Sequence, residues 1–438
     1  MRKLILIFSL SLLVINGDIF AQQDSIWTLE KCIDYALKQN IDVRQSELSN
    51  KKSGLYAGQA KAQRFPSVNA SVNQNFNWSR STAGYSGFSG ANGSGYSITS
   101  GVILYNASKL SNQIKQAQLE IESGEYSLET TKESISLNIL NAFLDVLYAG
   151  EQVENSQKQI ESTAGQLALA QERLALKAIS LSDFSQVKAQ LASEKLTLAN
   201  AESQLSMAKI TLMQLMELPV SENFNIAHPD LQGSLNQKRV PDVYEIYERA
   251  LAIKPQIKNA SVNKEIAGLD EKIAKASYFP VLSASAGLSS SFSSEKVNPY
   301  FDQLNDGINT VAGFSLSIPI YQKKEAKTSV AIARIGYQDA ELSEINTKNQ
   351  LRKNIEQACL DVTSAQIKYE ASVENYLATT ESTALSDEKF RQGIINSVDF
   401  LVSKTNLIVA ESELLQSKYN LIFSYKVLDF YSGIPLSL

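Results

Sequence analysis

Residues 184–219 read FSQVKAQLASEKLTLANAESQLSMAKITLMQLMELP, and residues 400–435 read FLVSKTNLIVAESELLQSKYNLIFSYKVLDFYSGIP. Each stretch carries an apolar residue at every seventh position: Phe184, Leu191, Leu198, Leu205 and Leu212 in the first, and Phe400, Leu407, Leu414, Leu421 and Leu428 in the second. A seven-residue apolar repeat keeps one face of a helix against a neighbouring helix, and it is typical of supercoiled pairs.

The two stretches are in the same phase, because every apolar residue of the first precedes its counterpart in the second by the same distance along the chain. One stretch alone would indicate an ordinary helix with an apolar stripe, whereas two favour a duplicated coiled coil. The segment AKAQRFPSVNAS at 60–71 also matches AKASYFPVLSAS at 274–285. We therefore expect two structural repeats, at 22–218 and 242–438, joined by a polar connector at 219–241.

The remaining helical patterns predict a specific packing. Helices are expected at about 42–64, 107–174 and 183–217, and a second long helix at about 323–391. At 1.5 Å per residue the 107–174 helix is roughly 100 Å long, and its two shorter neighbours are roughly 35 Å and 52 Å. Each repeat is therefore expected to pack one long helix against two shorter helices placed end to end.

Directly after each matched segment the apolar residues begin to alternate with polar ones. Val68, Ala70, Val72, Phe76 and Trp78 alternate with serine and asparagines, so a strand with one apolar and one polar face is predicted at about 68–78. Similar patterns predict strands at about 96–105, 280–292 and 310–321, with hairpin loops at 79–95 and 293–309. The order in each repeat is helix, strand, strand, long helix, shorter helix.

The length and the two faces of these strands match transmembrane β-strands. The alternative is a soluble hairpin with one face on a core, but the Asn- and Ser-rich polar faces suit a wet channel. Four strands cannot close a barrel, and an open sheet edge in lipid would leave backbone groups unpaired. Two chains would give eight strands and a filled interior, and three would give twelve strands and room for a pore.

Composition and single residues limit the other possibilities. Residues 1–21 have the basic start and apolar core of a signal peptide. The net charge of −5 argues against nucleic-acid binding. Cys32 and Cys359 fit no metal spacing, and either a disulfide or two buried thiols remains open. The single histidine, His228, falls in the connector, and no nucleophile or phosphate-binding motif is present, so neither an enzyme nor a cofactor is expected.

The sequence resembles the TolC family of outer-membrane efflux proteins over essentially the whole mature chain. The resemblance is carried by TLEKCIDYALKQNIDV at 28–43, by the duplicated AKAxxFP followed by a strand, and by the two heptad helices with their preceding turns. It implies a mainly α-helical homotrimer with a twelve-stranded β-barrel in the outer membrane of a Gram-negative bacterium. It also implies a twelve-helix tunnel across the periplasm, docked at its tip to a periplasmic adaptor protein and an inner-membrane pump.

The resemblance also points to residues in the two turns that precede the heptad helices. Adaptor docking would involve Lys177 and Ala178 in the first turn and Gln392, Gly393 and Ile394 in the second. Lys177 stands where the family has a glycine, which argues against a contact that needs close backbone approach there. The family's closing tyrosine and arginine align with Phe390 and Ile395, so no polar latch is expected from those two positions.

Two acidic residues near these turns are candidates for a gate at the channel entrance. Asp399 matches the first of two acidic positions that ring the entrance in the best-known family members, and the second is Val402 here. A threefold ring of Asp399 carboxylates would favour cations. The alternative is that Asp399 and Asp183 only stabilise the first turn of their helices, and this alternative is favoured for Asp183.

These observations predict a passive outer-membrane duct that exports small molecules such as drugs and toxic compounds from the periplasm to the exterior as part of a tripartite complex, with metals or proteins as the other possible cargo. The alternative is a periplasmic coiled-coil scaffold or adaptor without a barrel. The amphipathic strand pairs favour the duct.

Overall fold

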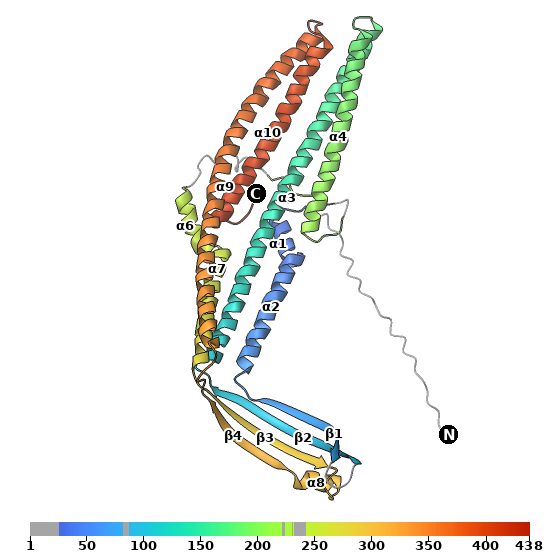
Figure 1. Cartoon of the computed structure of the whole chain (residues 1–438). Coiled ribbons are helices and arrows are strands. Elements are labelled where there is room, and N and C mark those ends of the chain that lie inside the picture. Colours follow the sequence, from blue (N-terminus) through green and yellow to red (C-terminus); the bar gives the residue numbers. More distant parts are fainter. Residues whose placement is uncertain (1–25, 82–86, 221–223, 230, 232–241) are drawn as a thin grey trace, which may run out of the picture.

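The computed structural model of the chain describes residues 26–81, 87–220, 224–229, 231 and 242–438. The expected signal peptide at 1–21 and most of the expected connector lie outside these residues. Helices occupy one part of the molecule and a four-stranded sheet the other, with the sheet at the end away from two helical hairpins (Figure 1).

Two helices of 67 residues each, roughly 100 Å long, form the frame of the helical part. They are α3 (Lys109–Ala175) and α9 (Glu325–Arg391). The shorter helices are α1 (Leu29–Gln39), α2 (Ile41–Ala62), α4 (Leu181–Leu215), α6 (Val243–Ile253), α7 (Pro255–Lys275) and α10 (Ser397–Ser432). Where the sequence predicted a range, the helix begins and ends close to it.

The short helices stack end to end beside the long ones, as predicted. The side-chain amide of Asn40, which caps α2, donates to the carbonyl of Leu215 at the end of α4, at 3.0 Å. In the second half the ammonium group of Lys254, before α7, lies 3.2 Å from the ring centroid of Phe430, near the end of α10. In each half the end of one short helix therefore meets the start of another.

The apolar core forms two clusters, one at the middle of each long helix. The first gathers Leu29 and Cys32 of α1 with Phe143 of α3 and Leu212 of α4. The second gathers residues of α6, α9 and α10, with Ile246, Leu351, Ile355, Cys359 and Leu421 among them. Both cysteines are free and buried, so of the two alternatives left open by the sequence the structure shows two buried thiols. Burial raises the pKa of the Cys32 thiol to about 12.

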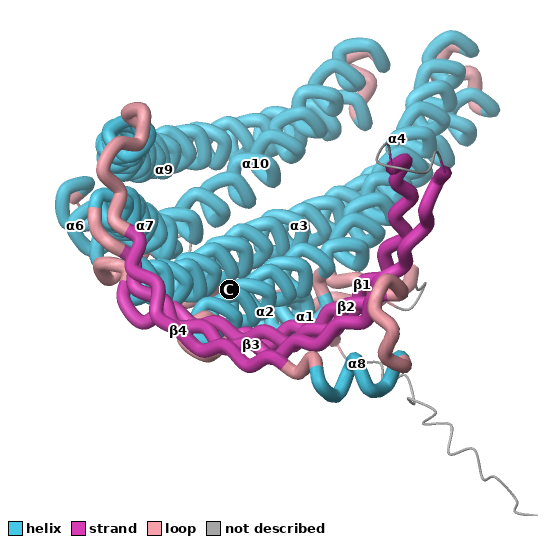
Figure 2. The backbone as a smooth tube through the Cα atoms, turned by 60° about the horizontal axis from the view of Figure 1, so that its bottom comes forward, coloured by secondary structure: helices cyan, strands magenta, loops and turns pink. Residues whose placement is uncertain are grey.

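The sheet consists of β1 (Ser67–Ser81), β2 (Gly87–Tyr105), β3 (Val281–Ser293) and β4 (Asn309–Ser317), in that order and all antiparallel. Its strands form one curved sheet (Figure 2). Ile98 pairs with Ala70 on one side and Leu288 on the other, while Thr99 pairs with Asn69 and Gly287. Because directly paired residues share a face, the sheet has one apolar and one polar face, as predicted.

Three boundaries of the sheet differ from the prediction. The expected loop at 79–95 is largely strand, because glycine and serine complete a backbone ladder as other residues do. The expected loop at 293–309 contains a short helix, α8 (Tyr300–Asp306). The fourth strand ends at Ser317 rather than near 321, because Pro319 has no amide hydrogen to donate.

Each long helix begins from the sheet through the same backbone geometry. Ala107 and Ser108 before α3 have φ values of 51° and 63°, and Lys323 and Lys324 before α9 have values of 46° and 68°. Two consecutive left-handed residues are rare for side chains with a Cβ atom. Their recurrence at the same place supports the internal duplication. No helix among the described residues is long and apolar enough to cross a membrane.

Candidate entrance at the two hairpin tips

The α3–α4 and α9–α10 hairpins end in turns with one hydrogen-bond pattern. In the first turn the amide of Ala178 donates to Arg173 O at 2.8 Å, and that of Lys177 to Leu174 O at 2.9 Å. In the second, Ile394 donates to Lys389 O at 2.9 Å, with an equivalent inner bond from Gly393 to the Phe390 carbonyl at 3.1 Å. This pair of bonds closes a helix end around one left-handed residue.

Lys177 and Gly393 are those left-handed residues, with φ values of 57° and 73°. A Cβ atom built on Gly393 would meet no atom within 4 Å. Glycine is therefore favoured at this position by backbone conformation and not by lack of space. Lys177 adopts the same conformation with a Cβ atom, at a steric cost of roughly 1 kcal/mol.

The five residues expected to dock an adaptor are all exposed at the two tips: Lys177, Ala178, Gln392, Gly393 and Ile394. The expected docking residue Ile394 is 66% exposed. The turns also expose two leucines that the sequence analysis did not single out, Leu176 at 80% and Leu181 at 68%. Leucines directly beside a helix cap, where polar residues are usual, are the sequence signal that could have identified them.

Asp183 holds the first turn of α4 and also connects it to the second hairpin. Its carboxylate accepts from the Ser180 amide at 3.3 Å, and the Ser180 hydroxyl oxygen accepts from the Asp183 amide at 3.0 Å, which together form a capping box. The same carboxylate oxygen also lies 2.6 Å from the Ser180 hydroxyl. The other carboxylate oxygen lies 2.6 Å from the hydroxyl of Ser397, a fully buried residue of α10. Hydrogen bonds from Ser180 and Ser397 hold the pKa of Asp183 below its usual range.

Asp399 has a different environment, although it occupies the matching position of α10. Its backbone amide donates to the side chain of the cap residue Asn396, with 2.8 Å between Asp399 N and Asn396 Oδ1. Its own side chain is exposed, as is that of Val402 one turn further on. The structure thus places Asp183 in a contact between the hairpins and leaves Asp399 on an open surface.

A second contact joins the tips through Arg173. Its guanidinium donates to the carbonyl of Phe390 at 3.1 Å and also to that of Arg391. These are carbonyls of the last turn of α9, where the helix dipole favours a cation. Phe390 itself packs inward, with its ring stacked 4.9 Å from the ring of Phe400. Phe390, which aligns with the family's tyrosine, therefore contributes apolar packing. The polar contact between the two tips comes from Arg173 instead.

Further from the tips, a buried ion pair crosses between the hairpins. Lys404 Nζ of α10 lies 3.3 Å from Glu194 Oε1 of α4, and the two side chains are only 7% and 5% exposed. Thr163 of α3 donates to the other carboxylate oxygen at 2.5 Å and accepts from Lys404. Gln190 donates to Glu194 Oε1 at 3.0 Å. Burial lowers the pKa of the Lys404 ammonium, and the Glu194 carboxylate opposes this shift.

Two further contacts continue this line between α3 and α10. Gln159 donates to Glu411 at 3.1 Å, and Lys418 Nζ lies 2.8 Å from Glu151 Oε1, which also accepts from the Tyr419 hydroxyl at 2.6 Å. Along this line the hairpins are joined by polar and ionic groups, next to the apolar contact that Ile422 of α10 makes in the first core cluster. Sequence reasoning did not identify these residues, because each partner lies in the other repeat, on a helix far along the chain.

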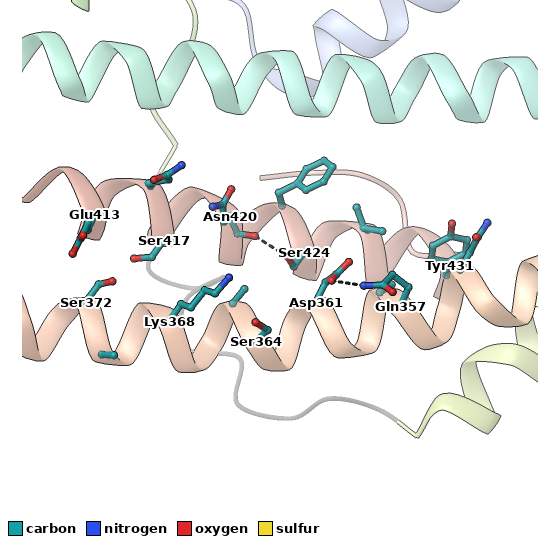
Figure 3. Close-up of a pocket in the computed structure, with 17 residues that line it drawn as sticks. Gln357, Asp361, Ser364, Lys368, Ser372, Glu413, Ser417, Asn420, Ser424 and Tyr431 are labelled. Atoms are coloured by element: carbon teal, nitrogen blue, oxygen red, sulfur yellow. Dashed lines mark hydrogen bonds between the residues drawn. The ribbon is translucent and has the colours of Figure 1, made fainter. Parts of the chain in front are cut away.

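Two grooves of about 830 Å³ each open on the helical surface. One lies near the tips between α3, α9 and α10, and its lining includes Gly165, Thr383 and Leu407, one from each helix. The other lies lower, between α9 and α10, and is lined by serines and by charged groups, Asp361 and Lys368 from α9 and Glu413 from α10 (Figure 3). In the described part of the chain, no cluster of three His, Cys, Asp or Glu residues could hold a metal ion.

Comparison with known proteins finds a matching family model and several similar solved structures. A family model described as outer membrane efflux protein matches residues 32–217 and 246–433. A structure of CusC superposes with a TM-score of 0.80 at 16% identity, covering 93% of this chain and 92% of CusC. The CmeC outer membrane channel of Campylobacter jejuni gives 0.77 at 16% identity, covering 92% and 85%. The MtrE outer membrane channel of Neisseria gonorrhoeae gives 0.76 at 17% identity, covering 94% and 90%. No curated protein sequence matches the chain.

Proposed function

Because the chain belongs to the outer membrane efflux protein family, we propose that three copies form one export duct whose helical part serves as its periplasmic entrance. The family places the protein in the outer membrane of a Gram-negative bacterium, as an efflux channel with its helices in the periplasm. Selectivity then comes from the lining and the entrance of the duct.

The observation that carries the proposal is the open sheet. Its apolar face includes exposed side chains such as Val72, Phe314 and Leu316, and its edge strands β1 and β4 pair with no further strand in the described part of the chain. In lipid these edges must be paired. β1 and β4 run antiparallel to each other, so β4 of one copy can pair with β1 of the next in the same pattern. Three copies close twelve strands.

The helical half supports the same stoichiometry. Exposed apolar residues run along α9, with Ile335, Leu342, Leu360 and Ile367 between 63% and 65% exposed. On the other side of the subunit, Leu48 and Leu55 of α2 are 63% and 76% exposed. An exposed apolar stripe of this length is expected to lie in an interface. We propose that α9 of one copy packs on α2 and α4 of its neighbour.

The repeats at 22–218 and 242–438, with the connector at 219–241, are proposed to supply equal shares of the wall. The tips are proposed to receive a periplasmic adaptor, and through it an inner-membrane pump. Three exposed apolar residues there, Leu176, Leu181 and Ile394, suit protein contact better than water. The exported molecule is proposed to be small and driven by the pump, because the duct itself offers no energy source.

Asp399 is proposed as the gate residue that sets ion preference, while Asp183 is proposed to hold the first turn of α4 against Ser397. An exposed Asp399 near a threefold axis would place three carboxylates around the entrance and would attract cations. Asp183 has its carboxylate oxygens occupied by Ser180 and Ser397, so it contributes less to the field seen by a passing ion.

Conductance of the purified protein in a planar bilayer, with its mass determined in parallel, tests the proposal. We expect small, cation-selective currents from a trimer. Asp399→Ala should reduce the preference for potassium over chloride, whereas Glu248→Ala, at an exposed acid on α6 far from the tips, should leave it unchanged. A monomer in the soluble fraction that forms no channels would contradict the proposal and would favour a periplasmic scaffold.

A further inference from the structure

The short helix α8 is fixed against the sheet by its own polar contacts. Gln303, which is 5% exposed, donates to Asn298 O at 2.6 Å and accepts from the Ser293 amide at 3.0 Å. The hydroxyl of Ser290 on β3 donates to the carbonyl of Leu304 at 2.6 Å. The segment between β3 and β4 thus has a defined position on the sheet.

That position is on the apolar face of the sheet. The Tyr300 hydroxyl of α8 lies 2.5 Å from that of Tyr96 on β2, and the Tyr300 ring centroid lies 4.6 Å from that of Phe292 on β3. Tyr96 and Phe292 alternate along their strands with the polar-face residues, so they share a face with Ile98 and Leu288. Figure 2 shows α8 on the convex side of the curved sheet. In a closed barrel that side faces lipid.

The height of α8 along the strands matches the edge of a bilayer. On β3 the apolar face starts at Leu282, and Phe292 lies ten residues further on. At about 3.4 Å per residue and a strand tilt of about 40°, this separation corresponds to about 26 Å of height. The apolar band of an outer-membrane barrel is about 25 Å tall, with aromatic residues at both boundaries. Tyr300 and Phe292 therefore lie at the outer boundary.

The exposed side of α8 suits this boundary layer. Phe301 is 80% exposed and its ring meets that of Tyr300 edge to face, at 5.4 Å between centroids. Asp302 and Asp306 are exposed on the same helix. Carboxylates are costly in hydrocarbon, whereas an aromatic ring is favoured at the headgroup level. The helix can therefore lie along the interface but no deeper.

A neighbouring copy of the chain is a poor candidate to cover Phe301. The helix lies over β2 and β3, the two central strands, whereas copies join through β1 and β4. The surface next to α8 is the apolar face of the sheet, so the same lipid that covers that face reaches the helix.

We propose that α8 is an interfacial anchor whose Phe301 ring inserts among the lipids of the outer leaflet. This inference rests on the proposed barrel and adds a specific lipid contact to it. The anchor would fix the height of the barrel in the bilayer and restrict tilting of the long helical part below.

Tryptophan fluorescence with brominated lipids tests the contact, because bromine quenches only indoles that touch the acyl chains. The chain contains two tryptophans, Trp27 and Trp78. Phe301→Trp in a Trp27→Phe, Trp78→Phe background gives the α8 probe. Trp27→Phe alone keeps Trp78, on the apolar face of β1, as the probe of the barrel. Asn77→Trp in the tryptophan-free background is the matched control on the polar face.

Trimers of each variant are placed in vesicles of phosphatidylcholine with or without bromine on the acyl chains. We expect the Phe301→Trp and Trp78 probes to lose at least half their emission in brominated vesicles. The Asn77→Trp control should change little there and should be quenched by acrylamide in the water phase.

The outcomes separate the two proposals. If Trp78 is quenched by brominated lipid but the Phe301→Trp probe is quenched only by acrylamide, the anchor is wrong and the barrel stands. If the Phe301→Trp probe is shielded from both quenchers, protein covers α8 and the anchor is also wrong. If brominated lipid fails to quench Trp78, the barrel proposal fails first.

Discussion

The two hairpin tips have the same backbone and different chemistry. Lys177 and Gly393 hold equivalent left-handed positions, closed by equivalent pairs of hydrogen bonds. The backbone conformation of the turn therefore follows from the hydrogen bonds to the last carbonyls of the long helix. Both a lysine and a glycine adopt the left-handed conformation there. Equal geometry in duplicated segments does not require equal residues.

The residues that the two hairpins contribute to the contacts between them differ more than their turns do. The first supplies Glu194, Asp183 and Arg173, and the second supplies Lys404 and Ser397, together with the carbonyls at the end of α9. Lys404 and Asp183 have identical counterparts in the other repeat, Lys188 and Asp399. Their partners Glu194 and Ser397 instead correspond to Ala410 and Leu181, so in each side-chain contact only one of the two partners differs between the repeats.

The largest effect is expected when the buried ion pair is broken from one side. Lys404→Met should lower the free energy of unfolding by about 3–5 kcal/mol, because Glu194 would stay buried without its cation. The double variant with Glu194→Met should recover most of this loss. Thermal unfolding of the detergent-solubilised trimer, followed by circular dichroism at fixed protein concentration, measures both. Equal losses in the single and double variants would show that the pair does not couple the hairpins.

A smaller loss of stability is expected when either aspartate is replaced. The two replacements should differ in their effect on ion preference. Asp183→Ala removes a capping box and the contact to Ser397, and should cost about 1–2 kcal/mol with little change in ion preference. Asp399→Ala should reduce cation preference and cost less stability. Conductance measures the ion preference of both variants, and thermal unfolding measures their stability. A loss of cation preference in Asp183→Ala alone would reverse the assignment.

The two turns should respond with opposite signs to changes at the left-handed position. Lys177→Gly should stabilise the trimer by up to about 1 kcal/mol, and Gly393→Ala should destabilise it by about 1 kcal/mol. Because a Cβ atom at Gly393 meets nothing, the second effect is conformational and not steric. Thermal unfolding measures both, with Gly165→Ala in α3, where a Cβ atom also meets nothing, as a control expected to stabilise. If Lys177→Gly and Gly393→Ala changed the stability in the same direction, the two left-handed positions would not be equivalent.

The smallest effect is a dependence of stability on pH that arises from Asp183 at the first tip. The pKa of Asp183 is lowered in the folded protein, so its contribution to stability is present above the unfolded value of about 3.9 and is lost as pH falls through the folded value. The stability difference between the wild type and Asp183→Asn should be constant from about pH 5 to 7 and should shrink below about pH 4. A difference that grows on acidification would refute the role of the ionised carboxylate.

Periodic features could be predicted from the sequence because they repeat locally. Phe65-Pro66 and Phe279-Pro280 end helices, alternation assigns strand faces, and the lengths of α2, α3 and α4 allow only end-to-end stacking. The cross-hairpin contacts could not be predicted, because Lys404 and Glu194 meet only after four helices have packed. The helix α8 was missed because seven residues are too few to show a helical period. The roles of Asp399 and the docking residues remain predictions.

The open edges of the sheet also set an order for biogenesis. Each hairpin is built from contacts close in sequence, which form quickly, whereas β2 can meet β3 only across the whole of α3, α4, α6 and α7. A lone chain that reached this state would carry two unpaired strand edges, the surface on which proteins aggregate. The final closure of the sheet is therefore best delayed until three chains have met at the membrane. If the apolar residues exposed along α9 and α2 lie between copies, as proposed, the helical parts offer a surface for that meeting.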